Sequence, residues 1–256
     1  MDWHQIIYPV MTYFRRRRLV KFIEAFPNIS SYCVLDVGGR PFLWQLLKEE
    51  YGLAPKSLTL LNTPSEVLLP DSSDYSIVIA DGRELPYEDN SFDLVFSNSV
   101  IEHVGDYAQM AQFAKECDRV GHGLYIQTPN RWFPIEAHFG TAFIHWLPRT
   151  LYKKLSVFSL RYYFSRNNPI EKDYFQQELE TTLLISKKQL QQFFPSKSIV
   201  AERVLGLVKS WIVVDAETVG AQCLHTHSIE AQDIRIQIEA EVPDIELAVS
   251  AQKKTQ

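Results

Sequence analysis

The chain has 256 residues, of which 46% are hydrophobic, 12% aromatic and 22% charged. This composition excludes a disordered, collagenous or disulfide-scaffold protein, and the length allows one large decorated domain or two small ones. Because 31 acidic residues outnumber 26 basic ones, the formal net charge is −5, which argues against an electrostatic nucleic-acid binder. We expect no nucleic acid among the partners.

The cysteines and the N-terminal segment bear on the compartment. Three widely separated cysteines form no CxxC pair, so the sequence indicates neither a zinc site nor a disulfide framework. In the N-terminal segment the basic run follows the apolar stretch, which is the wrong order for a signal peptide. The most apolar neutral run, residues 139–147, is shorter than the roughly 20 residues that span a bilayer. We therefore expect a cytoplasmic protein with no metal site.

Hydrophobic periodicity predicts an alternation of helices and strands. An amphipathic helix is predicted first, over residues 13–26, and ends at Pro27. The later predictions, in chain order, are a strand over 32–37, a helix over 42–51, strands over 57–61, 75–80 and 92–97, a helix over 100–117 and a strand over 123–128. Continuous apolar strands alternating with helices favour an α/β fold with a parallel sheet covered on both faces.

After residue 130 this alternation stops. A long aromatic stretch precedes a short predicted helix over 187–194 and two strands over 199–204 and 209–214, which form a terminal antiparallel pair. Right-handed crossovers then give a doubly wound, mostly parallel sheet whose ligand crevice lies at the carboxyl ends of the strands.

The turn after the first predicted strand is a candidate ligand site. It reads VLDVGGRPF, with Asp36 two residues before Gly38. Glycines at a strand-to-helix turn let the backbone approach a ligand and present amide groups at a helix N-terminus. The dinucleotide pattern GxGxxG is absent, because residues 38–43 read GGRPFL. Taken alone, the turn fits a tight connection as well as it fits a ligand site.

A longer pattern is more specific. Residues 80–97 read ADGRELPYEDNSFDLVFS and continue through NSVIEHV to Val104. In order, spacing and placement on strands, this run resembles the class I S-adenosylmethionine-dependent methyltransferases, in the small-molecule branch called methyltransferase type 11. The resemblance covers residues 32–130 and continues more loosely to about 214. It implies a Rossmann-like seven-stranded sheet, S-adenosylmethionine as cofactor and methyl transfer as the reaction.

The resemblance implies roles for the first turn. Gly38 and Gly39 would form the floor under the methionine part of the cofactor, with Asp36 orienting the loop. Arg40 and Phe42 stand at two positions where the family usually has glycine. These departures raise a second hypothesis, a degenerate and non-catalytic binding module, although the Arg40 guanidinium could instead meet the cofactor's carboxylate.

Three further strand ends have implied roles. Asn62 stands where the family usually has an acid that holds both ribose hydroxyls, and an amide lacks that charge-assisted pair. Asp81 and the backbone of Gly82 would meet the adenine ring. Ser97 and Asn98 would face the methylsulfonium group and the acceptor.

Two histidines are candidates for the catalytic base. A neutral hydroxyl acceptor needs a proton acceptor, and histidine suits that role near pH 7. His103, expected one turn into the helix after the fourth strand, would lie at the mouth of the crevice, and His138 is a second candidate. Alternatively, Glu102 and His103 only cap or orient that helix. Oxygen is the favoured acceptor atom because no Asn-Pro-Pro-Tyr signature follows the fourth strand, and transfer to carbon or nitrogen stays an alternative.

The segment after the fifth strand is rich in aromatic and basic residues. Residues 131–166 hold ten of the 32 aromatic residues. In the family this segment commonly forms a cover over the acceptor, which indicates a small-molecule, lipid-linked, quinone-like or sugar acceptor. The alternative is a helical hairpin packed on the sheet edge. The four arginines at 15–18 are expected to form a solvated helix face, and this helix or the aromatic insertion could contact a membrane surface.

The sequence therefore divides into three parts. A basic N-terminal helix occupies residues 1–29, and the methyltransferase domain occupies 30–214 with its insertion at 131–185. An acidic extension over 215–256 contains a strictly alternating pattern that predicts a β-hairpin. The oligomeric state does not follow from these features.

Overall fold

The computed structural model describes residues 3–64, 72–136 and 138–216. Its centre is a seven-stranded sheet with the order β3-β2-β1-β4-β5-β9-β8. The strands are β1 (Cys33–Val37), β2 (Ser57–Asn62), β3 (Ser76–Ile79), β4 (Phe92–Asn98), β5 (Gly121–Pro129), β8 (Ser198–Val204) and β9 (Leu207–Asp215). Strands β1 to β5 pair in parallel, and β9 is antiparallel to both of its neighbours. The predicted doubly wound α/β sheet with a terminal antiparallel pair is confirmed.

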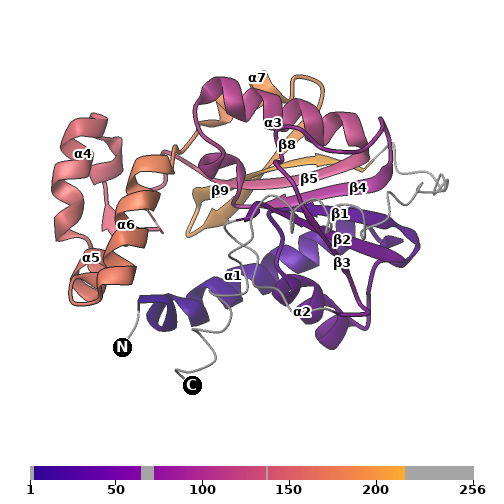
Figure 1. The fold of residues 1–256 in the computed structure, drawn as a ribbon, viewed down its shortest axis with the longest axis horizontal. Coiled ribbons are helices and arrows are strands. Elements are labelled where there is room, and N and C mark those ends of the chain that lie inside the picture. Colours follow the sequence, from indigo (N-terminus) through magenta and orange to yellow (C-terminus); the bar gives the residue numbers. More distant parts are fainter. Residues whose placement is uncertain (1–2, 65–71, 137, 217–256) are drawn as a thin grey trace, which may run out of the picture.

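Helices cover both faces of the sheet (Figure 1). One face carries α1 (Trp3–Ala25) and α2 (Pro41–Tyr51), and the other carries α3 (Tyr107–Val120) and α7 (Lys187–Phe193). Pro41 suits the first turn of α2 because that turn needs no amide donor, and Gly52 ends the helix with φ of 65°. Helix α2 therefore begins beside the glycine turn at the carboxyl end of β1.

Each face of the sheet has its own apolar core. Under α1, the ring of Phe22 makes edge contacts with Trp44, Phe96 and Tyr125. Under α3, the buried ring of Phe113 belongs to a cluster that includes residues of β1, β4, β5 and β9. Burial of this kind supplies most of the free energy of folding, and it fixes the strand ends that carry the site.

Two helix predictions need correction. Helix α1 begins at Trp3, about ten residues before the predicted start. The single helix predicted over 100–117 is a 3-10 turn, η3 (Ile101–His103), followed by α3. Gly105 separates them with φ of 122°, and Asp106 caps α3 by accepting from Gln109 N at 3.0 Å. His103 therefore lies in a short turn before the helix.

The insertion after β5 forms a lobe beside the sheet (Figure 1). It contains a two-stranded hairpin of β6 (Ile135–Glu136) and β7 (Thr141–Ala142), the turns η4 (Ile144–Trp146) and η5 (Ser156–Phe158), and the helices α4 (Arg149–Leu155), α5 (Leu160–Ser165) and α6 (Pro169–Thr181). Its aromatic residues pack in a core of their own, formed by Phe139, Tyr152, Phe175 and Leu179. The lobe is therefore more than a hairpin laid on the sheet edge.

A short turn, η1 (Ile29–Ser31), links α1 to β1. The hairpin predicted in the C-terminal extension lies outside the described residues. None of the helices in the described part of the chain is both long and apolar enough to cross a membrane.

Candidate functional site

The predicted cofactor residues gather at one edge of the sheet. Asp36 is the last residue but one of β1, and Asn62 is the last residue of β2. Asp81 follows β3, and Asn98 is the last residue of β4. These four strands are neighbours in the sheet, and they run parallel. Their carboxyl ends therefore meet at one edge, which is where an open α/β sheet binds its ligand.

The glycine turn after β1 has no room for side chains. Gly38 has φ of 74°, and a Cβ there would lie 2.5 Å from Val100 Cγ2. A Cβ at Gly39 would lie 2.1 Å from Asp36 Cγ. The Asp36 carboxyl is buried, with Oδ2 accepting from Trp44 Nε1 at 2.7 Å and Oδ1 without a partner. Burial raises the pKa of Asp36 to about 7, although the Trp44 bond acts in the opposite direction.

Asn62 fixes this turn from the neighbouring strand. Its Nδ2 donates to the Gly39 carbonyl at 2.9 Å, and the Gly38 amide donates to the Leu61 carbonyl at 2.7 Å. A carboxylate at position 62 has no proton to donate to a carbonyl. The amide therefore suits this particular turn, in which Arg40 stands exposed as the N-cap residue of α2.

Asp81 presents a charged and partly exposed carboxylate. It accepts from the backbone amide of Arg83 at 2.9 Å and pairs with the guanidinium of the same residue. Hydrogen bonds from Arg83 hold the pKa of Asp81 below its usual range. A Cβ at Gly82 would come within 2.9 Å of both Phe113 and Val37, so the backbone here lies directly on the core.

Ser97 and Asn98 are both engaged within the protein. The Ser97 hydroxyl is fully buried and donates to the Val37 carbonyl at 3.0 Å, which ties β4 to β1. Asn98 Oδ1 accepts from Arg18 of α1. The predicted contacts of these two residues with the methylsulfonium group stay predictions.

Arg18 is the residue at this edge that sequence reasoning missed. The expected solvated face for residues 15–18 is wrong at this position, because Arg18 is only 6% exposed. Its Nη2 lies 3.1 Å from Glu202 Oε2 on β8. Position 18 lies four residues before Phe22, on the stripe of α1 that packs on the sheet, and this helical spacing could have shown its burial.

The structure brings the two predicted catalytic histidines together. The ring centroids of His103 and His138 are 5.0 Å apart, with an interplanar angle of 84°. His103 Nδ1 lies 3.2 Å from Thr182 Oγ1. His138 Nδ1 lies 2.6 Å from Glu136 Oε1, and its Nε2 lies 4.0 Å from Glu102 Oε1. This histidine pair lies between the carboxyl edge of the sheet and the insertion lobe.

Burial and charge act differently on the two imidazoles. Burial, together with the charge of His138, lowers the pKa of His103 to about 3. Burial also disfavours a charged His138, but the carboxylates of Glu136 and Glu102 outweigh it and raise the pKa of His138. The pKa of Glu102 is raised by its complete burial. His103 is therefore neutral at pH 7, but a pKa this low makes its imidazole a weak proton acceptor.

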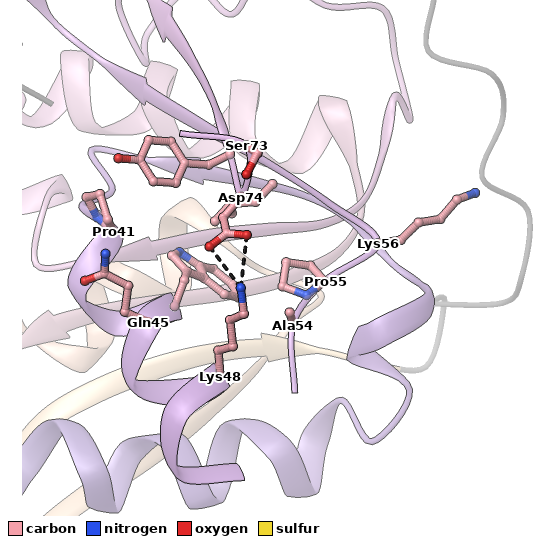
Figure 2. A pocket seen from close by; sticks show the side chains of 11 residues that line it. Pro41, Gln45, Lys48, Ala54, Pro55, Lys56, Ser73 and Asp74 are labelled. Carbon is pink, nitrogen blue, oxygen red and sulfur yellow. Dashed lines mark hydrogen bonds and ion pairs between the residues drawn. The ribbon is translucent and has the colours of Figure 1, made fainter. Parts of the chain in front are cut away.

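A pocket also opens away from this edge (Figure 2). It lies between α2 and the amino ends of β2 and β3. In this pocket, Lys48 Nζ lies 3.0 Å from each carboxylate oxygen of Asp74. Its lining includes Pro55 and Lys56, at the amino end of β2. It contains none of the predicted cofactor or catalytic residues, and both members of its ion pair are exposed.

Comparisons with known proteins found similar sequences and similar structures. A family model described as a methyltransferase domain matches residues 49–123. Malonyl-[acyl-carrier protein] O-methyltransferase 1 of Coxiella burnetii is 29% identical over 104 residues, which cover 40% of this chain and 34% of the relative. The chain thus matches about a third of the length of this curated relative.

Two solved structures are also similar. Phosphoethanolamine N-methyltransferase 2 of Haemonchus contortus, in complex with S-adenosyl-L-methionine, has 15% identity and a TM-score of 0.45, over 73% of this chain and 38% of its own. A methyltransferase of Methanosarcina mazei has 18% identity and a TM-score of 0.40, over 72% and 91%.

The family-model match and the motif run of residues 80–104 fall on the same part of the chain. The strand order is that of a doubly wound sheet, and residues 49–123 match a methyltransferase domain. The matched residues span β2, β3, β4 and α3, and they include Asp81, Glu102 and His103.

Proposed function

We propose that this chain binds S-adenosylmethionine at the carboxyl edge of β1 to β4 and transfers its methyl group to an oxygen of a small-molecule, lipid-linked or sugar acceptor. The convergence of Asp36, Asn62, Asp81 and Asn98 on one edge carries the proposal. A turn that excludes any Cβ at Gly39 provides the close backbone approach that this cofactor needs.

The residues at this edge fit the cofactor. The buried Asp36 Oδ1 has no partner in the described chain, and an unpaired buried oxygen is a common feature of a ligand site. Gly38 and Gly39 would lie beneath the methionine part, with Arg40 beside its carboxylate and Asn62 close to the ribose. Asp81 and the Gly82 backbone would hold the adenine. When bound, S-adenosylmethionine supplies a methyl group on a positively charged sulfur, which is already strongly electrophilic.

The histidine pair defines the acceptor side. We propose His103 and His138 as the candidate bases that accept the proton leaving the acceptor hydroxyl. As the new carbon–oxygen bond forms, the carbon–sulfur bond breaks and its electron pair stays on sulfur, while the hydroxyl proton passes to a base. The protein's own contribution is to align the acceptor and exclude water.

Cofactor binding tests the proposal directly. Asp81→Ala removes a charge-assisted hydrogen bond worth about 1.5–3 kcal/mol, so we expect S-adenosylmethionine affinity to fall about 10–100-fold. Gly39→Ala forces a methyl group onto Asp36 and is expected to weaken binding at least as much. Titration calorimetry measures both.

Gly206→Ala is the matched control for the glycine variant. Gly206 lies in the β8–β9 turn, where a Cβ would meet no described atom within 4 Å apart from its chain neighbours; because its φ is 81°, far-UV circular dichroism checks that the alanine variant folds. We expect it to bind the cofactor with unchanged affinity. No detectable binding by the unaltered chain would refute the enzyme proposal.

The non-catalytic hypothesis makes a different prediction. A degenerate module would bind the cofactor without turnover, whatever acceptor is offered. Arg40 and Phe42 favour it, whereas the donation from Asn62 to the Gly39 carbonyl argues that the acid-to-amide change preserves the turn. An acceptor screen with labelled cofactor separates these hypotheses.

The insertion lobe supports an apolar acceptor. It exposes large hydrophobic side chains, with Phe158 83%, Ile170 79% and Leu160 56% exposed. Exposed apolar surface of this extent is typical of a binding surface. We therefore include quinone precursors, glycolipids and small phenols in the acceptor screen, and we propose contact of this lobe or of α1 with a membrane surface as the route to a lipid-linked acceptor.

A further inference from the structure

The histidine pair has the composition of a metal centre. One ligand atom from each of Glu102, His103 and His138 lies within 4.8 Å of the others. Two imidazole nitrogens and one carboxylate oxygen form a ligand set that binds first-row divalent cations, among them Zn²⁺, Fe²⁺ and Mn²⁺. Ligand atoms about 2.1 Å from a shared ion lie about 3.0–3.5 Å apart, so ligand atoms at the 4.8 Å limit would need to approach each other by about 1.3–1.8 Å.

The carboxylate of Glu102 points to a missing partner. Glu102 is fully buried, and its Oε2 accepts from Thr128 Oγ1 at 2.9 Å. Its Oε1 accepts no hydrogen bond from another residue in the described ranges, and it lies 4.0 Å from His138 Nε2. A buried carboxylate oxygen without a partner is strongly unfavourable. A cation between Oε1 and the imidazoles would satisfy it.

Each of the three side chains already has an orienting partner. Glu136 holds His138 Nδ1 at 2.6 Å and also accepts from the backbone amides of His138 and Phe139. Thr182 holds His103 Nδ1, and Thr128 holds the far oxygen of Glu102. A carboxylate behind one histidine and hydroxyls behind the other ligands are the outer partners that fix ligands around a metal.

The charge balance favours a divalent ion. Two buried carboxylates, Glu102 and Glu136, face each other across His138. Arg161 lies close by, where it forms an ion pair with Glu178 while its Nη1 donates to the His138 carbonyl at 3.1 Å. When ionised, the two carboxylates carry a charge of −2, which a divalent ion would neutralise.

We propose that Glu102, His103 and His138 bind one divalent transition-metal ion, and that the acceptor's hydroxyl oxygen occupies a position left open by the three protein ligands. Three ligands with an open position are typical of a catalytic centre, and coordination to a divalent ion lowers the pKa of a bound hydroxyl. This role rests on the proposed function and changes one step of it: the metal-bound hydroxyl would release its proton to solvent, and the two histidines would act as metal ligands in place of a base. Metal binding itself does not depend on the proposed function.

Metal binding to the full chain tests the proposal. After removal of metal with a chelator, Mn²⁺ is titrated and the free ion is followed by electron paramagnetic resonance, with Zn²⁺ and Mg²⁺ in parallel calorimetric titrations. We expect one Mn²⁺ or Zn²⁺ ion per chain and much weaker binding of Mg²⁺, which prefers an all-oxygen site. Nitrogen coupling in the pulsed spectrum of bound Mn²⁺ would identify imidazole ligands.

Variants locate the ion. Glu102→Gln keeps the side-chain shape, and we expect it to reduce affinity about 100-fold or more, as should His138→Ala. Thr128→Val, which removes only the partner of Oε2, should reduce it about 10-fold. His122→Ala, at the start of β5, is the control and should bind normally. Far-UV circular dichroism checks that each variant folds.

The outcomes separate this proposal from the enzyme proposal. No stoichiometric metal binding, or binding that Glu102→Gln and His138→Ala leave unchanged, overturns the metal site. S-adenosylmethionine titration of the same samples shows whether cofactor binding survives that result. Conversely, a chain that binds Mn²⁺ at this site but no S-adenosylmethionine keeps the metal site and loses the proposed function.

Discussion

Replacing His103 with alanine is expected to slow methyl transfer by about 10²–10⁴-fold, the usual contribution of a group that handles the reacting proton. The same variant should bind S-adenosylmethionine with nearly unchanged affinity. His103 contacts Thr182 and stacks edgewise on His138, whereas the glycine turn is held by Asn62 from a different strand. The measurement is the rate with a responding acceptor, set beside a calorimetric titration of the cofactor.

His122→Ala is the matched control for this experiment. His122 lies at the amino end of β5, away from the edge that carries the site, so we expect unchanged rate and cofactor affinity. An H103A variant as active as the unaltered chain rules out His103 both as base and as metal ligand. Restored activity of H103A on addition of imidazole would support a role for the ring itself.

The second large effect concerns folding stability and its pH dependence. Burial by itself would raise the pKa of Glu202, but the positive charges of Arg18 and Lys209 outweigh it and lower the pKa to about 2. A depressed folded-state pKa stabilises the protein above the unfolded value of about 4.5, and the stabilisation is lost as the pH falls towards 2. Glu202→Gln leaves the Arg18 guanidinium buried without its carboxylate. At pH 7 we expect the free energy of unfolding to fall by about 3 kcal/mol.

Urea denaturation at several pH values measures this effect. The difference between the unaltered chain and Glu202→Gln should be largest at neutral pH, shrink below pH 4.5 and vanish near pH 2. Glu180→Gln is the control, because Glu180 pairs with Lys153 at an exposed position; its effect should stay within about 0.5 kcal/mol. An equal loss in both variants would contradict a specific role for the buried pair.

Local patterns in the sequence were sufficient to predict most strands of the sheet. Each parallel strand is a short apolar run that ends in polar or glycine residues, and this pattern depends only on neighbours along the chain. The start of α2 at Pro41 and its end at Gly52 are likewise local. The expected roles of Asp36 and Asp81 came from motif spacing, and the structure places both at the predicted edge.

Other features depend on contacts between distant residues. Gly105 and the Asp106 cap divide the predicted helix, so that His103 lies in a separate turn before α3. The spacing of apolar residues does not show this break. The meeting of His103 with His138 depends on how the insertion lobe folds back, and no local pattern encodes that path. Glu136, buried within the lobe, was not foreseen as a partner of His138 for the same reason.

The buried contact of Arg18 with Asn98 and Glu202 has a consequence for the order of assembly. It joins the first helix, the middle of the sheet and one of the last strands at a single guanidinium. During synthesis, α1 and the five parallel strands emerge before residue 198, so Arg18 and Asn98 are made before the carboxylate of Glu202. A chain truncated before β8 would therefore lack the carboxylate that pairs with Arg18. The last strands of the sheet thus complete an electrostatic contact that begins in its first helix.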